Sequence, residues 1–223
     1  AIFLDKDGTL IDDVPYNVNP DQMRLAPKAG IALRRLARDY RLFVVSNQAG
    51  VAHGFFGEDA LPAVEQRLRQ LLAGEGIALD GFYYCPHHPS GADRRYRCRC
   101  ACRKPQPGML LQAAREHLLD LGQSWMIGDI LDDIEAGRRA GCRTVLIDNG
   151  GETEWQISDL RQPEFVVADL GLAADRILAS QPPPNNIPVI DPIGQQASLE
   201  TGGNDHARRP MGRRPETAVR PAR

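Results

Sequence analysis

Residues 1–9 read AIFLDKDGT, the pattern of a buried strand that ends at two carboxylates, Asp5 and Asp7. In an open α/β sheet the ligand site lies beyond the carboxyl ends of the strands, so polar side chains there face substrate rather than core. Gly8 lets the backbone turn tightly, and the two aspartates can divide the roles of nucleophile or metal ligand and of acid–base. The alternative for the same residues is an Asx-type turn after an ordinary strand.

Beyond this strand, short apolar runs alternate with amphipathic segments. The apolar runs predict strands at residues 2–4, 41–45, 81–84, 125–127, 144–147 and 165–167. Hydrophobic residues at helical spacing predict helices at residues 27–38, 59–72, 108–119, 132–140 and 170–178. Strands that alternate with helices of this length imply right-handed crossovers. We therefore expect an α/β fold with a doubly wound, mostly parallel, Rossmann-like sheet covered by helices on both faces.

Two segments interrupt this alternation. Residues 11–25 are too polar for a strand and too long for a turn, so we expect a short flap over the strand ends. From residue 181 the chain turns rich in Pro, Gly and Arg and lacks aromatic residues, so it cannot bury enough surface to offset its ordering entropy. The expected organisation is one domain over residues 1–180 and a disordered tail over residues 181–223.

The chain has an ordinary composition and only a small net charge. Of its 223 residues 42% are hydrophobic, which is enough for one sizeable core, and no run of about 18 apolar residues predicts a membrane span. A net charge of -2 gives no general attraction to nucleic acids or acidic membranes. Four of the five cysteines crowd into residues 85–102 as in a metal cluster, so we expect a cytoplasmic protein. The sequence starts at Ala1, inside the first strand, which leaves open whether residues precede it.

Another predicted strand end carries a hydroxyl and two amides. The strand at 41–45 runs into Ser46, Asn47 and Gln48. The Ser46 hydroxyl and nearby backbone N–H groups can hold a phosphoryl oxygen at this position. The alternative is a polar turn between a strand and a helix.

A third strand end is acidic. The strand at 125–127 runs into Asp129, and Asp132 and Asp133 follow where a helix begins. Carboxylates are ligands that Mg²⁺ prefers, usually one or two of them together with a substrate phosphate. Asp132 can instead cap the helix or interact with its dipole.

Six potential metal ligands lie between residues 85 and 102: Cys85, His87, His88, Cys98, Cys100 and Cys102. A Cys-x-His pair and a Cys-x-Cys pair supply three thiolates and an imidazole, which suit a closed, structural Zn²⁺ site. His88 and Cys98 are spare if both x-spaced pairs are kept. Such a site would pin an arginine-rich loop and the following Arg103 and Lys104. The alternative for the cysteines is a set of unrelated thiols. The alternative for Arg103 and Lys104 is an ordinary solvated surface pair.

Four motifs follow strands or loops in a fixed order: Asp-x-Asp-Gly-Thr (5–9), Ser-Asn-Gln-x-Gly (46–50), Arg-Lys-Pro (103–105) and Gly-Asp-x-x-x-Asp (128–133). Together they resemble the motifs of the haloacid dehalogenase (HAD) superfamily. Within it, the sequence YYCPHHP at 83–89 and the Cys-x-Cys-Arg-Lys-Pro end at 100–105 resemble the heptose bisphosphate phosphatases. The histidinol-phosphate phosphatases are similar but have a shorter zinc loop. The resemblance covers about residues 1–180.

This resemblance implies a HAD-type fold and a phosphatase that acts on a small phosphorylated sugar. Asp5 would attack phosphorus, and Asp7 would protonate the leaving oxygen and then deprotonate the attacking water. Mg²⁺ would be bound by the carboxylates of Asp5 and Asp129 and by the backbone carbonyl of Asp7. Ser46 and Lys104 would hold the phosphoryl oxygens.

The resemblance also implies roles around this centre. Arg103 and Lys104 would recognise the substrate. Asn47 and Gln48 would shape the pocket. Asp133 would orient Lys104 or metal-bound water. The implied zinc ligands are Cys85, His87, Cys100 and Cys102, which leaves Cys98 extra. The sequence departs from the heptose phosphatase pattern in the flap, at Ser46 and at Ile130, and these departures bear on the choice of sugar rather than on phosphoryl transfer.

Two other classes of function compete with this hypothesis. The arginines of residues 94–103 on a zinc-pinned loop can form a nucleic-acid-binding knuckle, but the overall charge and the four phosphatase motifs argue against it. A catalytically silent interaction protein is disfavoured by the intact Asp5, Asp7 and Asp129. We therefore expect a small-molecule substrate, no nucleic-acid or membrane partner, and a monomer.

Overall fold

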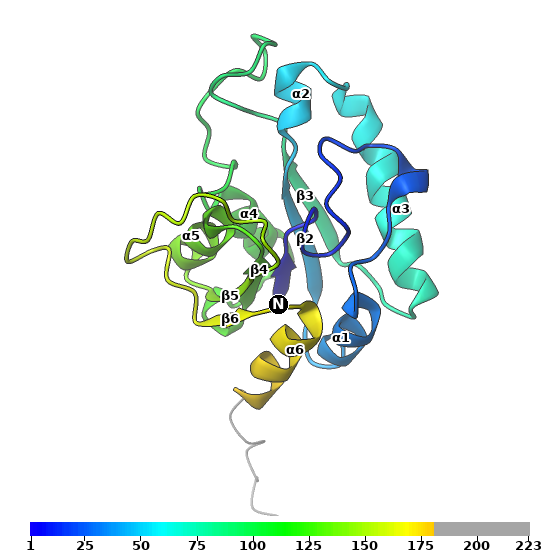
Figure 1. Ribbon diagram of the computed structural model, residues 1–223, viewed down its shortest axis with the longest axis vertical. Coiled ribbons are helices and arrows are strands. Elements are labelled where there is room, and N and C mark those ends of the chain that lie inside the picture. The colour runs from blue at the N-terminus through cyan, green and yellow to red at the C-terminus, as the bar shows by residue number, and fades with distance from the viewer. Residues whose placement is uncertain (181–223) are drawn as a thin grey trace, which may run out of the picture. The chain divides into compact units, whose positions relative to one another are not determined.

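Six parallel strands form one sheet in the computed structural model, which describes residues 1–180 (Figure 1). The strands are β1 (Ile2–Leu4), β2 (Leu42–Asn47), β3 (Gly81–Cys85), β4 (Trp125–Gly128), β5 (Arg143–Ile147) and β6 (Phe165–Val167). Their order is β3-β2-β1-β4-β5-β6, and Phe3 of β1 is in register with Phe43 of β2 and Met126 of β4. Because the chain winds outward from β1 in both directions, the carboxyl ends of β1 and β4 form the switch point where such sheets bind ligands.

Helices cover both faces of this sheet (Figure 1). The helices are α1 (Ala29–Leu36), α2 (Ala49–His53), α3 (Leu61–Gly74), α4 (Gly108–His117), α5 (Leu131–Ala140) and α6 (Leu170–Ala179), with short 3-10 helices η1 (Pro20–Gln22), η2 (Glu58–Ala60) and η3 (Leu121–Gln123). Ile2 and Leu4 pack in a core with α1, α3 and α6, whereas Phe3 packs with α4 and α5. Successive residues of a strand face opposite sides, so strands buried on both faces must be continuous apolar runs.

The predicted fold class is confirmed, and each predicted strand and helix forms with ends shifted by at most two residues. The five-residue helix α2 was not predicted, because so short a segment shows no helical periodicity. Within residues 1–180 no helix has the length and apolar character needed to cross a membrane.

Residues 11–25 leave the sheet directly after the Asp5–Asp7 turn, as expected of a flap. Ile11 and Leu25 form an antiparallel bridge that closes the base of this segment, hereafter the flap. Its side chains Asp13, Tyr16 and Asn17 line a cavity together with Asp7, so the flap does lie at the strand ends. The predicted disordered tail at residues 181–223 lies outside the described residues.

Candidate active site

Three aspartates from two strand ends converge at the switch point. The backbone N–H of Asp5 donates to the carbonyl of Ile127 at 2.9 Å, which fixes Asp5 between β1 and β4. Asp129 follows β4, and Asp133 lies in the first turn of α5. One carboxylate oxygen from each of Asp5, Asp129 and Asp133 lies within 4.8 Å of the others.

The close approach of Asp129 depends on a glycine in the first motif. Gly8 has a φ of +76°, and a Cβ there would lie 2.2 Å from Asp129 Oδ2. Burial, together with the charges of Asp5 and Asp133, raises the pKa of Asp129 to about 8. A buried cluster of hard oxygen donors at this spacing repels itself without a cation, so these residues fit Mg²⁺.

Lys104 is the cation that the protein itself supplies to this cluster. Its Nζ donates to Asp5 Oδ1 and, at 2.9 Å, to the carbonyl of Val45, and it forms an ion pair of 2.6 Å with Asp133 Oδ1. The Lys104 side chain is 2% exposed. Burial alone would lower the pKa of Lys104, but the two carboxylates raise it above its usual value, so the ammonium stays protonated.

The second motif at the end of β2 braces this arrangement. The Asn47 side chain accepts from the Lys104 N–H at 3.0 Å and donates to the Lys104 carbonyl at 3.1 Å. Gln48 Nε2 donates to Ser46 Oγ at 2.8 Å, and both side chains are buried. The structure therefore brings Ser46, Asn47 and Gln48 to the predicted site, where Asn47 and Gln48 hold neighbouring residues in position.

Asp7 has a partner that the sequence analysis missed. Lys6 is 1% exposed, and its Nζ donates to Asp7 Oδ1 at 2.7 Å. Burial raises the pKa of Asp7, and the charge of Lys6 offsets part of that rise. A raised pKa suits a carboxyl group that donates a proton. The signal in the sequence was a lysine directly between two aspartates.

Asn149, in the loop after β5, also contributes to the site and was not predicted. Its Nδ2 donates to the Gly8 carbonyl at 2.6 Å, which holds the turn of the first motif. No motif marks this residue, because its partner lies 141 positions away in the chain.

Asp132 is not part of the carboxylate cluster but lies in the first turn of α5, where an acidic side chain interacts favourably with the helix dipole, as one of the alternatives for it predicted. The carboxylate oxygens that converge are those of Asp5, Asp129 and Asp133, and Ile130 precedes α5 as its cap, with its N–H 3.3 Å from Asp133 Oδ2. Asp132 instead forms an ion pair of 2.6 Å with Arg161.

The four potential zinc ligands of the x-spaced pairs lie together, in the segment from β3 to Lys104. Their ligand atoms lie within 4.8 Å of one another: Cys85, His87, Cys100 and Cys102. The distances between sulfur atoms are 3.1, 3.3 and 3.5 Å, close to the edge of about 3.8 Å expected of a tetrahedron with Zn–S bonds of about 2.3 Å. Burial raises the pKa of Cys85, as expected for a thiol among thiols without a cation. This donor set fits Zn²⁺.

The two spare ligands lie elsewhere. Cys98 is exposed, and His88 Nδ1 contacts the Ser90 hydroxyl at 2.9 Å while its ring packs against His53. The structure thus resolves which four of the six candidates can share an ion.

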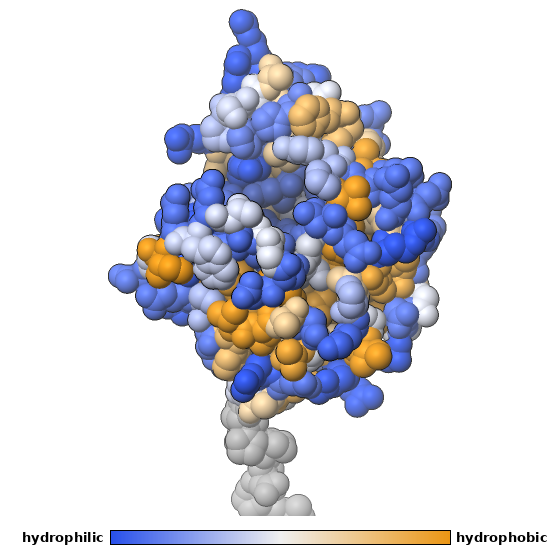
Figure 2. Space-filling model, viewed as in Figure 1, coloured by the Kyte–Doolittle hydropathy of each residue, from blue (hydrophilic) through white to orange (hydrophobic). Residues whose placement is uncertain are grey.

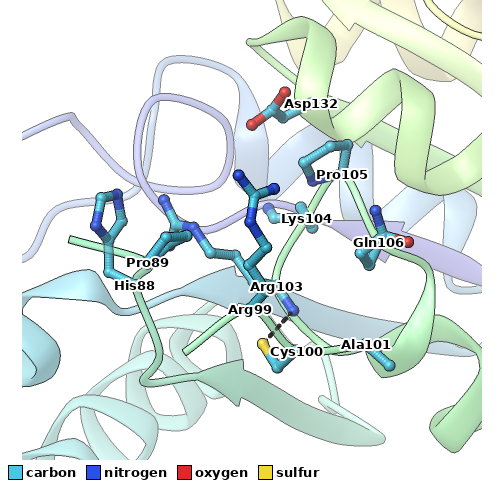
Figure 3. Close-up of a pocket in the computed structure, with 10 residues that line it drawn as sticks. All are labelled: His88, Pro89, Arg99, Cys100, Ala101, Arg103, Lys104, Pro105, Gln106 and Asp132. Carbon is cyan, nitrogen blue, oxygen red and sulfur yellow. Dashed lines mark hydrogen bonds between the residues drawn. The ribbon is translucent and has the colours of Figure 1, made fainter. Parts of the chain in front are cut away.

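A basic pocket of about 610 Å³ borders Lys104. Arg99 and Arg103 extend into it from the segment that carries the Cys/His cluster, and Asp132 lies on its far side (Figure 3). Arg103 is held at its backbone N–H by Cys100 Sγ at 3.4 Å and at its guanidinium by the His87 carbonyl at 3.3 Å. In Figure 2 a hollow bordered mostly by hydrophilic residues lies where Figure 1 shows the flap and the strand ends.

A parallel sheet with a carboxylate cluster and a buried lysine at its switch point defines a phosphatase of the HAD class. A family model described as HAD-hydrolase-like matches residues 101–173. Solved structures agree: a HAD-like phosphatase from Mesorhizobium loti has 34% identity and a TM-score of 0.70, covering 80% of this chain and 86% of that one. The D,D-heptose 1,7-bisphosphate phosphatase of B. bronchiseptica, complexed with magnesium and phosphate, has 33% identity and a TM-score of 0.69, covering 81% and 98%.

Curated relatives narrow the class. The D-glycero-β-D-manno-heptose-1,7-bisphosphate 7-phosphatase of Photorhabdus laumondii is 42% identical over 154 residues, 67% of this chain and 81% of the relative. The enzyme of the same name from Pasteurella multocida is 45% identical over 152 residues, 67% and 82% of the two chains. The chain belongs to this family of HAD phosphatases and is a phosphoric monoester hydrolase.

Proposed function

We propose that this enzyme hydrolyses the 7-phosphate of D-glycero-D-manno-heptose 1,7-bisphosphate, in an Mg²⁺-dependent reaction with an aspartyl-phosphate intermediate. The observation that carries the proposal is the position of Lys104, which contacts Asp5 on one side and borders the basic pocket on the other. One phosphate can react at Asp5 while the second phosphate of the same sugar interacts with arginines. Relatives that carry this activity in their names support the choice of sugar.

In the first half of the reaction, Asp5 attacks the phosphorus in line and forms the aspartyl-phosphate. Lys104 and Ser46 hold the phosphoryl oxygens as charge redistributes. The Lys104 ammonium is suited to this because Asp133 and the Val45 carbonyl hold it in place before substrate binds. The backbone of Asp5 is held in place by its hydrogen bond to the Ile127 carbonyl.

Asp7 carries the proton in both halves. It protonates the departing sugar oxygen, and the same carboxylate then deprotonates the water that hydrolyses the aspartyl-phosphate. The raised pKa of Asp7 favours the first role, and the hydrogen bond from Lys6 keeps the carboxylate oriented for the second.

The residues that would hold Mg²⁺ are Asp5 and Asp129 through their carboxylates and Asp7 through its backbone carbonyl. When bound, the ion neutralises charge between the carboxylates and the phosphate. Cys85, His87, Cys100 and Cys102 would hold a structural Zn²⁺, which ties the arginine-bearing segment to the end of β3. Cysteines that bind a metal instead of forming disulfides favour a reducing compartment, so we propose that the enzyme works in the cytoplasm.

The experiment compares kcat/KM for the heptose 1,7-bisphosphate, the heptose 7-phosphate and histidinol phosphate. We expect the bisphosphate to rank first, because binding energy from the remote phosphate can be used in the transition state. Arg103→Ala should erode this preference. The matched control is Arg95→Ala, on the same segment, whose exposed side chain pairs with Asp93 and faces a different cavity. Equal kcat/KM values for the bisphosphate and histidinol phosphate would refute the choice of sugar.

A further inference from the structure

A small cavity at Asp7 is separate from the basic pocket. It measures about 130 Å³ and is lined by Asp7, by Asp13, Tyr16 and Asn17 of the flap, and by residues from Asn47 to Phe56. On the same measure it is about a fifth of the size of the basic pocket, which has about 610 Å³. In so small a cavity a branched group meets the walls sooner than an unbranched one.

The flap side of this cavity is built on Tyr16. Its φ is +55°, an uncommon conformation for a residue with a side chain. The ring is 54% exposed, and it meets Phe55 edge to face, with ring centroids 4.6 Å apart. His53 packs against Phe55 at 5.6 Å. The contact with Phe55 therefore sets where the Tyr16 ring stands relative to Asp7.

The opposite side of the cavity packs closely on the rest of the protein. A Cβ at Gly50 would lie 2.1 Å from Phe56 Cε1, so the Phe56 ring rests directly on the backbone of α2. Asn47 is held by both backbone groups of Lys104. Of the flap residues that line the cavity, Tyr16 has the largest side chain, so we expect it to set the width of the cavity.

The proposed role of Asp7 determines which part of a substrate must enter. The leaving oxygen has to reach Asp7, so the carbon that bears this oxygen lies in the small cavity. A primary carbon brings one further carbon with it, whereas an anomeric carbon brings a ring oxygen and a ring carbon at once. The unbranched end of a sugar phosphate therefore suits a cavity of about 130 Å³ better than the branched anomeric end.

We propose that Tyr16 is a specificity-determining residue that restricts hydrolysis to phosphates on primary carbons and excludes anomeric phosphates, with Phe55 as its positioning residue. The inference deepens the proposed function and rests on its phosphatase chemistry, but not on the identity of the sugar. It explains how a bisphosphate that carries one phosphate of each kind loses only one of them.

The test measures phosphate release from mannose 6-phosphate and from α-mannose 1-phosphate, with Mg²⁺ present. The selectivity ratio is kcat/KM for the 6-phosphate divided by kcat/KM for the 1-phosphate. Tyr16→Ala should lower this ratio by at least about tenfold, mainly through faster hydrolysis of the 1-phosphate. Tyr16→Phe keeps the ring and should leave the ratio unchanged. Phe55→Ala should shift the ratio in the same direction as Tyr16→Ala, and the double variant should shift it no further than Tyr16→Ala.

Controls separate this effect from a general loss of structure. Ile31→Ala, at an exposed position of α1, should change neither kcat/KM value, and melting temperature and zinc content are measured for every variant. A folded Tyr16→Ala enzyme with the wild-type ratio would overturn the inference, as would a Tyr16→Phe enzyme that loses as much selectivity as Tyr16→Ala. If heptose bisphosphate is not hydrolysed but the mannose ratio depends on Tyr16, the choice of sugar fails and this inference stands.

Discussion

The side-chain amide of Asn47 pairs with both backbone polar groups of Lys104, accepting from its N–H at 3.0 Å and donating to its carbonyl at 3.1 Å. One amide thus replaces the two hydrogen bonds that a neighbouring strand would supply. It holds the segment that follows the Cys/His cluster at the carboxyl end of β2. The ammonium of Lys104 therefore starts from a fixed backbone when it reaches Asp5.

Asn47→Ala should lower kcat by about 10²-fold, because a misplacement of about 1 Å at the phosphate-binding lysine is enough for such a loss. Asn47→Asp keeps the acceptor but loses the donor, and it should fall between wild type and Asn47→Ala. Steady-state kinetics on the bisphosphate check the order. A rise in KM with unchanged kcat would instead indicate that Asn47 supports binding of the ground state and the transition state equally.

Asp5→Asn should abolish Mg²⁺-dependent phosphate release, with a loss of at least about 10⁴-fold, while the fold survives. Asp5 lies at the end of β1 rather than in the core, and its side chain is 13% exposed. Phosphate release and the melting temperature are measured on the same preparation. Turnover near that of wild type would refute the assignment of the nucleophile.

Zinc content should separate two cysteines that are two positions apart. Cys100→Ser should lose the metal, because Cys100 Sγ lies in the cluster, whereas Cys98→Ser should keep one Zn²⁺ per chain, because Cys98 is exposed outside it. Elemental analysis of protein purified without added metal distinguishes the variants. Equal loss from both would show that the chosen ligand set is wrong.

The buried pair of Lys104 and Asp133 should be strongly coupled in stability. Lys104→Met leaves the Asp133 carboxylate buried without its partner and should destabilise the fold by about 3–5 kcal/mol, whereas Asp133→Asn should cost less, because Lys104 keeps Asp5 as a partner. The double variant should lose clearly less than the sum of the two single losses. Denaturant unfolding of all four proteins, without added Mg²⁺, measures the coupling, and simple additivity would contradict it.

The strand ends could be predicted because their signal is local. Apolar runs interrupted by Asp5, Ser46 and Asp129 indicate both a parallel sheet and the edge where its ligands bind. The partners of these residues were harder to predict. Lys6 resembles a solvent-exposed lysine in the sequence, and only its 1% exposure shows that it serves Asp7. Asn149 reaches Gly8 across the sheet, a contact that no local pattern encodes.

The choice of metal ligands also could not be predicted from local sequence alone. Spacing alone offered six ligands for four positions. The choice became clear only in three dimensions, where the ring of His88 turns away to pack against His53. Tyr16 is a further case, because its importance depends on Phe55, a residue of another segment that it meets only in the folded chain.

His87 and Cys100 lie close together, so the stretch between them is a loop whose two ends meet at the same place. We expect that residues can be inserted or removed between the two ligand pairs without altering the path from Cys102 to Lys104, because the ligand pairs and Asn47 hold that path in place. The rim that selects a substrate can therefore diverge while the phosphoryl-transfer centre stays constant. The four-ligand cluster thus lies between the variable rim and the phosphoryl-transfer centre.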